Sequence, residues 1–227
     1  MRARSRTRIL QVAVALAATL VMAAGCHSFS KPAKPKYNVV AYVAGYRDFD
    51  FSTIQADKIT HVNYAFVNVV DGQVHFDTSI DNTPLKKDDI FKLHALKKIN
   101  PDLKVLVSVG GWTWSERFSD AAMTQAGREK LVRSCVDIYL KGNLPVFDGA
   151  GGPGSAAGVF DGIDVDWEYP ASPGDTGHVY RPEDTRNYTL LMQEFRKQMD
   201  ALTATTGREY ELTAAVPGGT EKIAKIE

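Results

Sequence analysis

The feature that most constrains the fold is a regular alternation of short apolar runs with segments of helical period, beginning at residue 37. The helical segments lie at 88–100, 131–140 and 188–202, where apolar residues recur every three or four positions. Parallel strands need crossover connections of this kind, so the alternation predicts a parallel sheet, either doubly wound or part of a (β/α)8 barrel. The expected strands are 37–46, 59–70, 103–109, 159–170 and 210–217.

Two glycine-containing segments interrupt this pattern. The pair Asp71-Gly72, followed by 73–76, predicts a small hairpin after the second strand. Segment 148–158 is rich in Gly and Ala, but it follows a helix and precedes a strand, which is the wrong order for cradling phosphates. We expect it to be a flexible surface insertion, and no G-x-G-x-x-G motif directly follows a strand to indicate dinucleotide binding.

The N-terminal segment indicates export. Four arginines precede a short apolar run, and small residues then lead to Cys26, so 1–25 is predicted to be a secretory signal. The "MAAGC" stretch resembles a bacterial lipobox, which predicts a lipid on Cys26 and a cell-envelope lipoprotein; ordinary cleavage would give a secreted protein. Residues 26–36 are expected to be a linker, and 37–227 the folded domain, whose single Cys135 allows no internal disulfide.

The stretch "VFDGIDVDWEYP" (159–170) alternates acidic with apolar residues. Side chains alternate across a strand, so Asp164, Asp166 and Glu168 share one face about 6.5 Å apart, while Trp167 belongs to the apolar face. A solvated outer face would also alternate, but parallel sheets are usually covered on both faces. If the acids point into a barrel or cleft, burial and mutual repulsion should raise at least one carboxyl pKa, as a general acid needs.

Three carboxylates could instead hold Ca2+ or Mg2+. The five histidines show no ligand spacing and the acids lie on a rigid strand, so no metal is expected.

Hydrophobic residues make up 44% of the chain and charged residues 24%, which is typical of a globular domain. The formal net charge is zero, so nucleic acid is not an expected partner.

These residues resemble glycoside hydrolase family 18, the chitinases. The family signature D-x-x-D-x-D-x-E is matched at all four acidic positions, Asp161, Asp164, Asp166 and Glu168. The segment 107–115 resembles the family motif S-x-G-G, with Ser108, Gly110 and Gly111 in the matching places. The resemblance extends from about Tyr37 to the end of the chain and implies the (β/α)8 barrel rather than a doubly wound sheet.

The resemblance implies a substrate-assisted mechanism, an exception to the two-carboxylate scheme. In it, Glu168 protonates the glycosidic oxygen and later activates water, while the acetamide of the substrate acts as nucleophile. Asp166 stabilises the acetamide nitrogen, and Asp164 tunes Asp166 by sharing a proton. Asp161 and Ser108 are expected to be supporting residues.

Aromatic side chains are expected to stack on sugars. Trp112 follows the double glycine, and Tyr42 and Phe66 lie on the first two strands, so all three are predicted to bind substrate. Tyr169 is expected to be a supporting residue or to stack on a sugar ring. An equal alternative is that the aromatic rings of these loops only pack against one another and do not bind sugar. Trp167 is expected in the core.

The chain also departs from the family pattern. We find about five of the eight strands, and nothing after Val216 resembles the family's M-x-Y-[DN] motif or the tryptophan of its eighth strand. We therefore expect a fragment containing about the first five βα units of a longer enzyme.

The predicted substrate is chitin or chitooligosaccharide, with no cofactor, and the chain is expected to be a monomer. The alternatives are an endo-β-N-acetylglucosaminidase and a non-catalytic chitin-binding lectin-like protein, although such lectins usually lose the acid that Glu168 provides here.

Overall fold

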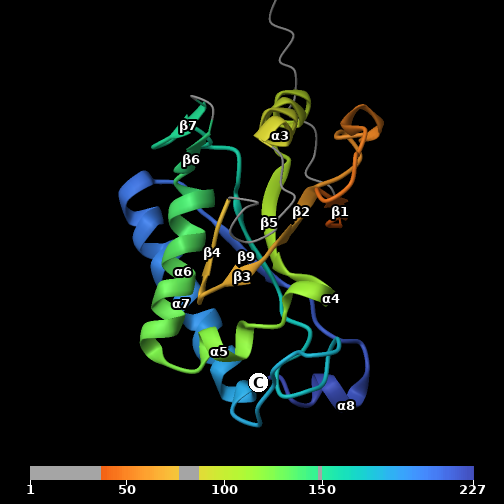
Figure 1. Ribbon diagram of the computed structural model, residues 1–227. Coiled ribbons are helices and arrows are strands. Elements are labelled where there is room, and N and C mark those ends of the chain that lie inside the picture. Colours follow the sequence, from red (N-terminus) through yellow and green to blue (C-terminus); the bar gives the residue numbers. More distant parts are fainter. Residues whose placement is uncertain (1–36, 77–86, 148–149) are drawn as a thin grey trace, which may run out of the picture. The chain divides into compact units, whose positions relative to one another are not determined.

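Five parallel strands form the central sheet of the computed structural model, which describes residues 37–76, 87–147 and 150–227 (Figure 1). Each strand pairs with the next one along the chain, so the sheet order follows the sequence order. The strands are β1 (Val40–Ala44), β2 (His61–Val67), β5 (Lys104–Gly110), β8 (Gly162–Asp166) and β9 (Glu211–Ala214). The prediction of five parallel strands is confirmed, whereas the expected signal and linker, 1–36, lie outside the described residues.

Three helical segments lie in the connections from β2 to β5, from β5 to β8 and from β8 to β9, as their apolar periodicity predicts. They are α3 (Lys87–Ile99), α6 (Gln125–Cys135), which continues as the π-helical turn η2 (Val136–Leu140), and α7 (Asp184–Thr206). Helices α6 and α7 lie side by side (Figure 1). Gly142 and Gly207 end η2 and α7 with backbone φ angles of 73° and 69°, conformations that favour glycine. Within the described ranges, no helix combines the length and apolar character that crossing a membrane requires.

The shorter elements lie in the connections. The predicted hairpin after β2 is confirmed as β3–β4. The glycine-rich segment lies at the surface, as expected, with Gly151 and 153–155 exposed, and part of it forms a strand. Strand Ala150–Gly152 pairs with Leu144–Phe147 as the hairpin β6–β7. Gly151 allows this close pairing, because it has a φ of 117° and a Cβ there would come within 2.2 Å of the Pro145 carbonyl oxygen. These elements are η1 (Phe51–Thr53), β3 (Val69–Val70), β4 (Gln73–Val74), α4 (Gly111–Trp114), α5 (Phe118–Ala122), β6 (Leu144–Phe147), β7 (Ala150–Gly152) and α8 (Thr220–Ile223).

The sheet curls strongly, as the wall of a barrel does. Tyr42 on β1 donates its hydroxyl hydrogen to Asp164 Oδ2 on β8 over 2.8 Å, although two strands lie between them. His61 on β2 and Glu211 on β9 are likewise 2.8 Å apart across two strands. A flat sheet would hold each pair about 14 Å apart. The fold is therefore a partial (β/α)8 barrel, and the described strands do not close it.

The outer face of the sheet packs against the helices. Trp167, just beyond β8, is 2% exposed, stacks on Phe118 of α5 at 5.3 Å between ring centroids, and also contacts Tyr188 of α7. Ile163 and Val165 are fully buried in the same core. The predicted alternation of β8 is thus confirmed, since its apolar side chains meet the helices.

Asp161 anchors the start of β8. Its carboxylate accepts hydrogen bonds from Lys97 Nζ at 2.6 Å, Arg208 Nη2 at 2.5 Å and the Val105 backbone N–H at 2.8 Å. Burial lowers the pKa of Lys97, and its hydrogen bond to Asp161 opposes that effect. These contacts join α3, β5 and the end of α7 to one acid, which is consistent with the supporting role predicted for Asp161.

Candidate active site

The double glycine at the end of β5 lets three segments meet closely. Gly110 has a φ of 104°, and a Cβ there would lie 2.3 Å from the Asp166 carbonyl oxygen. Gly111 has a φ of 82°, and its Cβ would come within 3.0 Å of the Phe66 ring. A larger residue at Gly110 would push β5 away from β8, and one at Gly111 would push the start of α4 away from Phe66, so both glycines allow the loop that follows β5 to lie beside the acids.

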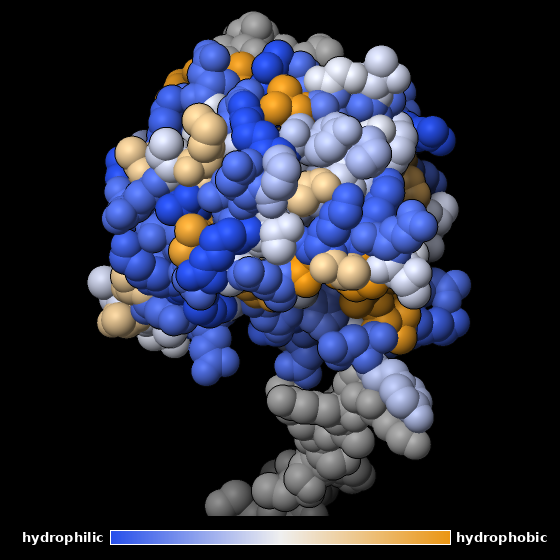
Figure 2. Space-filling model, turned by 90° about the horizontal axis from the view of Figure 1, so that it is seen from below, coloured by the Kyte–Doolittle hydropathy of each residue, from blue (hydrophilic) through white to orange (hydrophobic). Residues whose placement is uncertain are grey.

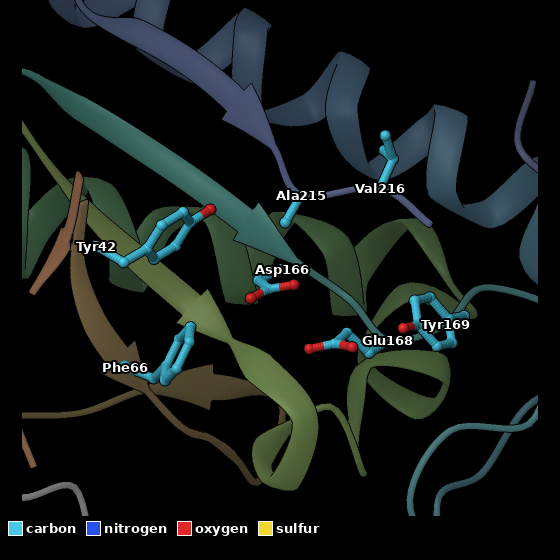
Figure 3. A pocket seen from close by; sticks show the side chains of 7 residues that line it. All are labelled: Tyr42, Phe66, Asp166, Glu168, Tyr169, Ala215 and Val216. Carbon is cyan, nitrogen blue, oxygen red and sulfur yellow. The ribbon is translucent and has the colours of Figure 1, made fainter. Parts of the chain in front are cut away.

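A pocket of about 330 Å³ lies beside the end of β8 (Figure 3). The carboxyl groups of Asp166 and Glu168 point into the space between Phe66 on one side and Tyr169 on the other (Figure 3). Seen from the end where α4 and α8 lie, the surface is largely hydrophilic with separate apolar patches (Figure 2). The residues that line the pocket are Tyr42, Phe66, Asp166, Glu168, Tyr169, Ala215 and Val216.

Asp164 lies beneath the pocket, 1% exposed, and is held by three hydroxyl groups. Tyr42 and Ser108 donate to Oδ2 at 2.8 and 2.7 Å, and Thr213 donates to Oδ1 at 2.6 Å. A carboxyl group accepts through both oxygens, so these three donors fix its orientation. Asp164 is therefore a rigidly held acid next to Asp166.

Among the acids of the pocket, Asp166 has the most strongly shifted pKa. Burial, followed by the nearby charges of Glu168 and Asp164, raises its pKa from 3.8 to about 7. This bears out the expectation that at least one carboxyl pKa of the acidic strand rises. At neutral pH, Asp166 is therefore poised between its protonated and ionised forms.

The aromatic residues divide between the pocket and its rim. Tyr42 and Phe66 line the pocket with ring centroids 6.3 Å apart, and burial, with the charge of Asp164, raises the pKa of Tyr42 well above its usual range. Trp112 on α4 is 48% exposed and packs edge-on against Tyr169, with centroids 6.4 Å apart, but it does not line the pocket. Burial and a hydrogen bond with Glu168 raise the pKa of Tyr169.

Three residues beside the acids were not singled out from the sequence. Thr213 faces inward with the phase of its strand, so the alternation of 210–217 could have indicated it. Lys222 of α8 places its Nζ 3.8 Å from the centroid of the Tyr169 ring, and Ser115 accepts a hydrogen bond from the Glu168 backbone N–H. No periodicity marks Lys222 or Ser115, because their positions depend on how two loops fold over the sheet.

Together these features define a class of protein: a (β/α)-barrel fold with a carboxylate site at the carboxyl ends of its strands. Among the described residues, no group of three or more His, Cys, Asp and Glu is placed to hold a metal ion.

Comparisons with known proteins identify the family. The model for "Glycosyl hydrolases family 18" matches residues 38–227. Chitinase A1 of Niallia circulans is 34% identical over 240 residues, covering 86% of this chain and 32% of that protein. The chain belongs to glycosyl hydrolase family 18, as its acidic motif predicted.

Solved structures agree with this assignment. The catalytic domain of psychrophilic chitinase B from Arthrobacter TAD20 has a TM-score of 0.77 and 36% identity, covering 83% of this chain and 54% of that one. A family 18 N-acetylglucosaminidase from Paenibacillus barengoltzii has a TM-score of 0.65 and 31% identity, with coverage of 84% and 49%. The chain therefore spans about half the length of these structures and about a third of the curated relative.

Proposed function

We propose that this chain carries the catalytic acids of a chitinase, which hydrolyses β-1,4-linked N-acetylglucosamine polymers with retention of configuration. The observation that carries the proposal is the pairing of Asp166 and Glu168 in one pocket, with the pKa of Asp166 raised to about 7. Its similarity to chitinase A1 and chitinase B supports the substrate class.

In the proposed mechanism, Glu168 donates its proton to the glycosidic oxygen as the bond from that oxygen to the anomeric carbon breaks. The carbonyl oxygen of the neighbouring acetamide forms a new bond to the same carbon, giving a cyclic oxazolinium ion. The Glu168 carboxylate then removes a proton from water as the water oxygen attacks the anomeric carbon and the ring reopens. Two inversions at this carbon give net retention.

The neighbouring acids support these steps. Asp166 accepts a hydrogen bond from the acetamide N–H and stabilises the positive charge that develops there. Three hydroxyls fix the orientation of the Asp164 carboxyl group, and in the proposed mechanism Asp164 shares a proton with Asp166. Trp112, Tyr42 and Phe66 bind the sugar rings, and Tyr42 also orients Asp164.

The test is hydrolysis of a fluorogenic chitooligosaccharide by the 227-residue chain and by the Glu168→Gln variant. We expect Glu168→Gln to lower kcat by about 10²- to 10⁴-fold, the usual contribution of a general acid. Glu183→Gln, at an exposed position before α7, is the matched control and should retain activity. Sugar binding without turnover in all three proteins would contradict the proposal and favour a lectin-like protein.

A second candidate is an N-acetylglucosaminidase, favoured by the similarity to the Paenibacillus barengoltzii enzyme. An exo-acting enzyme would release single sugars from chitohexaose, whereas an endo-β-N-acetylglucosaminidase would release N-glycans from a glycoprotein and leave chitohexaose intact. Product analysis on both substrates distinguishes these activities from a chitinase, which would cut chitohexaose into oligosaccharides.

Export and lipidation of Cys26 form a separate part of the proposal. The basic and apolar start of the chain and the "MAAGC" motif support it. We expect the mature protein to be recovered with bacterial membranes, and Cys26→Ser to release it into the soluble fraction. Equal membrane association of both proteins would argue against a lipid anchor at this residue.

A further inference from the structure

The hydroxyl of Ser115, directly after α4, lies between the two acidic positions of the pocket. Its Oγ accepts a hydrogen bond from the Glu168 backbone N–H at 2.8 Å. It also lies 2.9 Å from each of two backbone acceptors, the carbonyl oxygens of Asp166 and Gly111. Ser115 is only 1% exposed, so water does not compete for these contacts.

These contacts prolong the β5–β8 ladder beyond its last residue pair. The ladder ends where Gly110 faces Asp166, because the chain then turns into α4. In a parallel sheet, a residue facing Trp167 would donate its N–H to the carbonyl of Asp166 and accept from the N–H of Glu168. Ser115 reaches both groups with one oxygen, and its hydroxyl thereby replaces the missing strand residue.

The other side of the Glu168 peptide unit is also closely packed. A Cβ on Gly174 would lie 2.0 Å from the Glu168 carbonyl oxygen, so the returning loop passes directly against it. His178 Nδ1 lies 3.3 Å from the same oxygen, while its Nε2 lies 3.3 Å from the Thr113 carbonyl oxygen. Glu168 follows the last residues of β8, so these loops set the position from which its side chain reaches the pocket.

We propose that Ser115 is a positioning residue: it holds the backbone of Glu168 in the position from which the Glu168 carboxyl group reaches the glycosidic oxygen. The inference rests on the proposed function, since it assigns Ser115 a part in proton donation by Glu168. Loss of the hydroxyl leaves the partly buried N–H of Glu168 without this acceptor and frees the end of the catalytic strand to shift. A displacement of about 1 Å at a reacting group can slow catalysis about 100-fold.

The test compares two aryl chitobiosides that share the same sugar but differ in the leaving group. One leaving group requires protonation, and the other, a dinitrophenolate, departs without it. For Ser115→Ala, we expect kcat to fall roughly 10- to 100-fold on the first substrate and several-fold less on the second, with little change in KM. The ratio of the two kcat values is measured on one sample, so it is insensitive to the folded fraction.

Ser119→Ala is the matched control. Ser119 is also fully buried, and its hydroxyl makes two hydrogen bonds, to Asp184 Oδ1 at 2.8 Å and from Arg181 Nη1 at 2.6 Å, both to residues outside β8. We expect Ser119→Ala to leave the ratio at the wild-type value. If Ser115→Ala yields no folded protein, Ser115→Cys, with a thiol that bonds weakly, is expected to change the ratio in the same direction.

The outcomes separate the two proposals. An equal loss on both substrates in Ser115→Ala, or an unchanged ratio in Ser115→Cys, would overturn the positioning role while wild-type turnover still supported the glycosidase. Absence of hydrolysis by the wild-type chain would instead contradict the proposed function itself.

Discussion

Replacing Asp166 with Asn should remove a loss of stability that the wild-type protein undergoes as the pH rises from about 4 to 8. In the folded state the pKa of Asp166 is about 7, against an ordinary value of 3.8. The folded state therefore retains a proton that the unfolded chain has already released between these two values. The stability that this proton contributes is fully present below pH 3.8 and is lost as the pH rises through 7.

The size of the effect follows from that interval. At about 1.4 kcal/mol for each pH unit, the full loss of unfolding free energy is at most about 4 kcal/mol. About 2.5 kcal/mol of this loss falls between pH 5 and pH 8. Because Asp166 lines an open pocket, screening by water lowers the expected value to between about 1 and 2.5 kcal/mol.

Urea unfolding of both proteins at pH 5 and pH 8 measures this quantity. The advantage of Asp166→Asn over wild type should grow by that amount between the two pH values. Asp57→Asn, at an exposed position before β2, is the control, and its difference from wild type should remain constant. If the advantage of Asp166→Asn were the same at both pH values, the raised pKa of Asp166 in the folded protein would be refuted.

Three further substitutions test the scaffold and the rim of the pocket. Gly110→Ala should cost at least about 2 kcal/mol more than Gly72→Ala, since both have positive φ but only Gly110 meets a backbone oxygen; thermal unfolding of the two variants measures the difference. Trp167→Ala should lower the urea unfolding free energy by about 3–5 kcal/mol through loss of buried aromatic packing. Trp112→Ala should raise KM for long chitooligosaccharides severalfold and leave stability unchanged, and steady-state kinetics on short and long oligomers would check it.

Much of the fold follows from local pattern. Periodicity alone locates the five strands and predicts that they are parallel, and the alternation of 163–168 correctly places Trp167 in the core, on the opposite face from the acids. Such inferences succeed because they depend only on the two faces of a strand and on the chirality of short crossovers. The family motif adds the identity of the acids, which alternation could not distinguish from a solvated face.

The parts that were not predicted depend on curvature and loop geometry. The hydroxyl of Tyr42 reaches Asp164 only because the sheet curls across two intervening strands. Ser115 reaches the Glu168 N–H only because a short helical turn brings it back to the sheet edge. Neither relation has a fixed spacing in the sequence, so propensity and periodicity carry no signal for it.

The anchoring of β8 also has a consequence for how different parts of the chain exchange with solvent. This strand has a neighbour on each side, the Asp161 cluster at its start and Ser115 at its end. We therefore expect its amide hydrogens to exchange with deuterium only through large-scale opening. In the described sheet, β1 and β9 each have a single neighbour, so local fraying exposes their amides first. The strand that carries the acids is thus expected to open later than the edge strands β1 and β9.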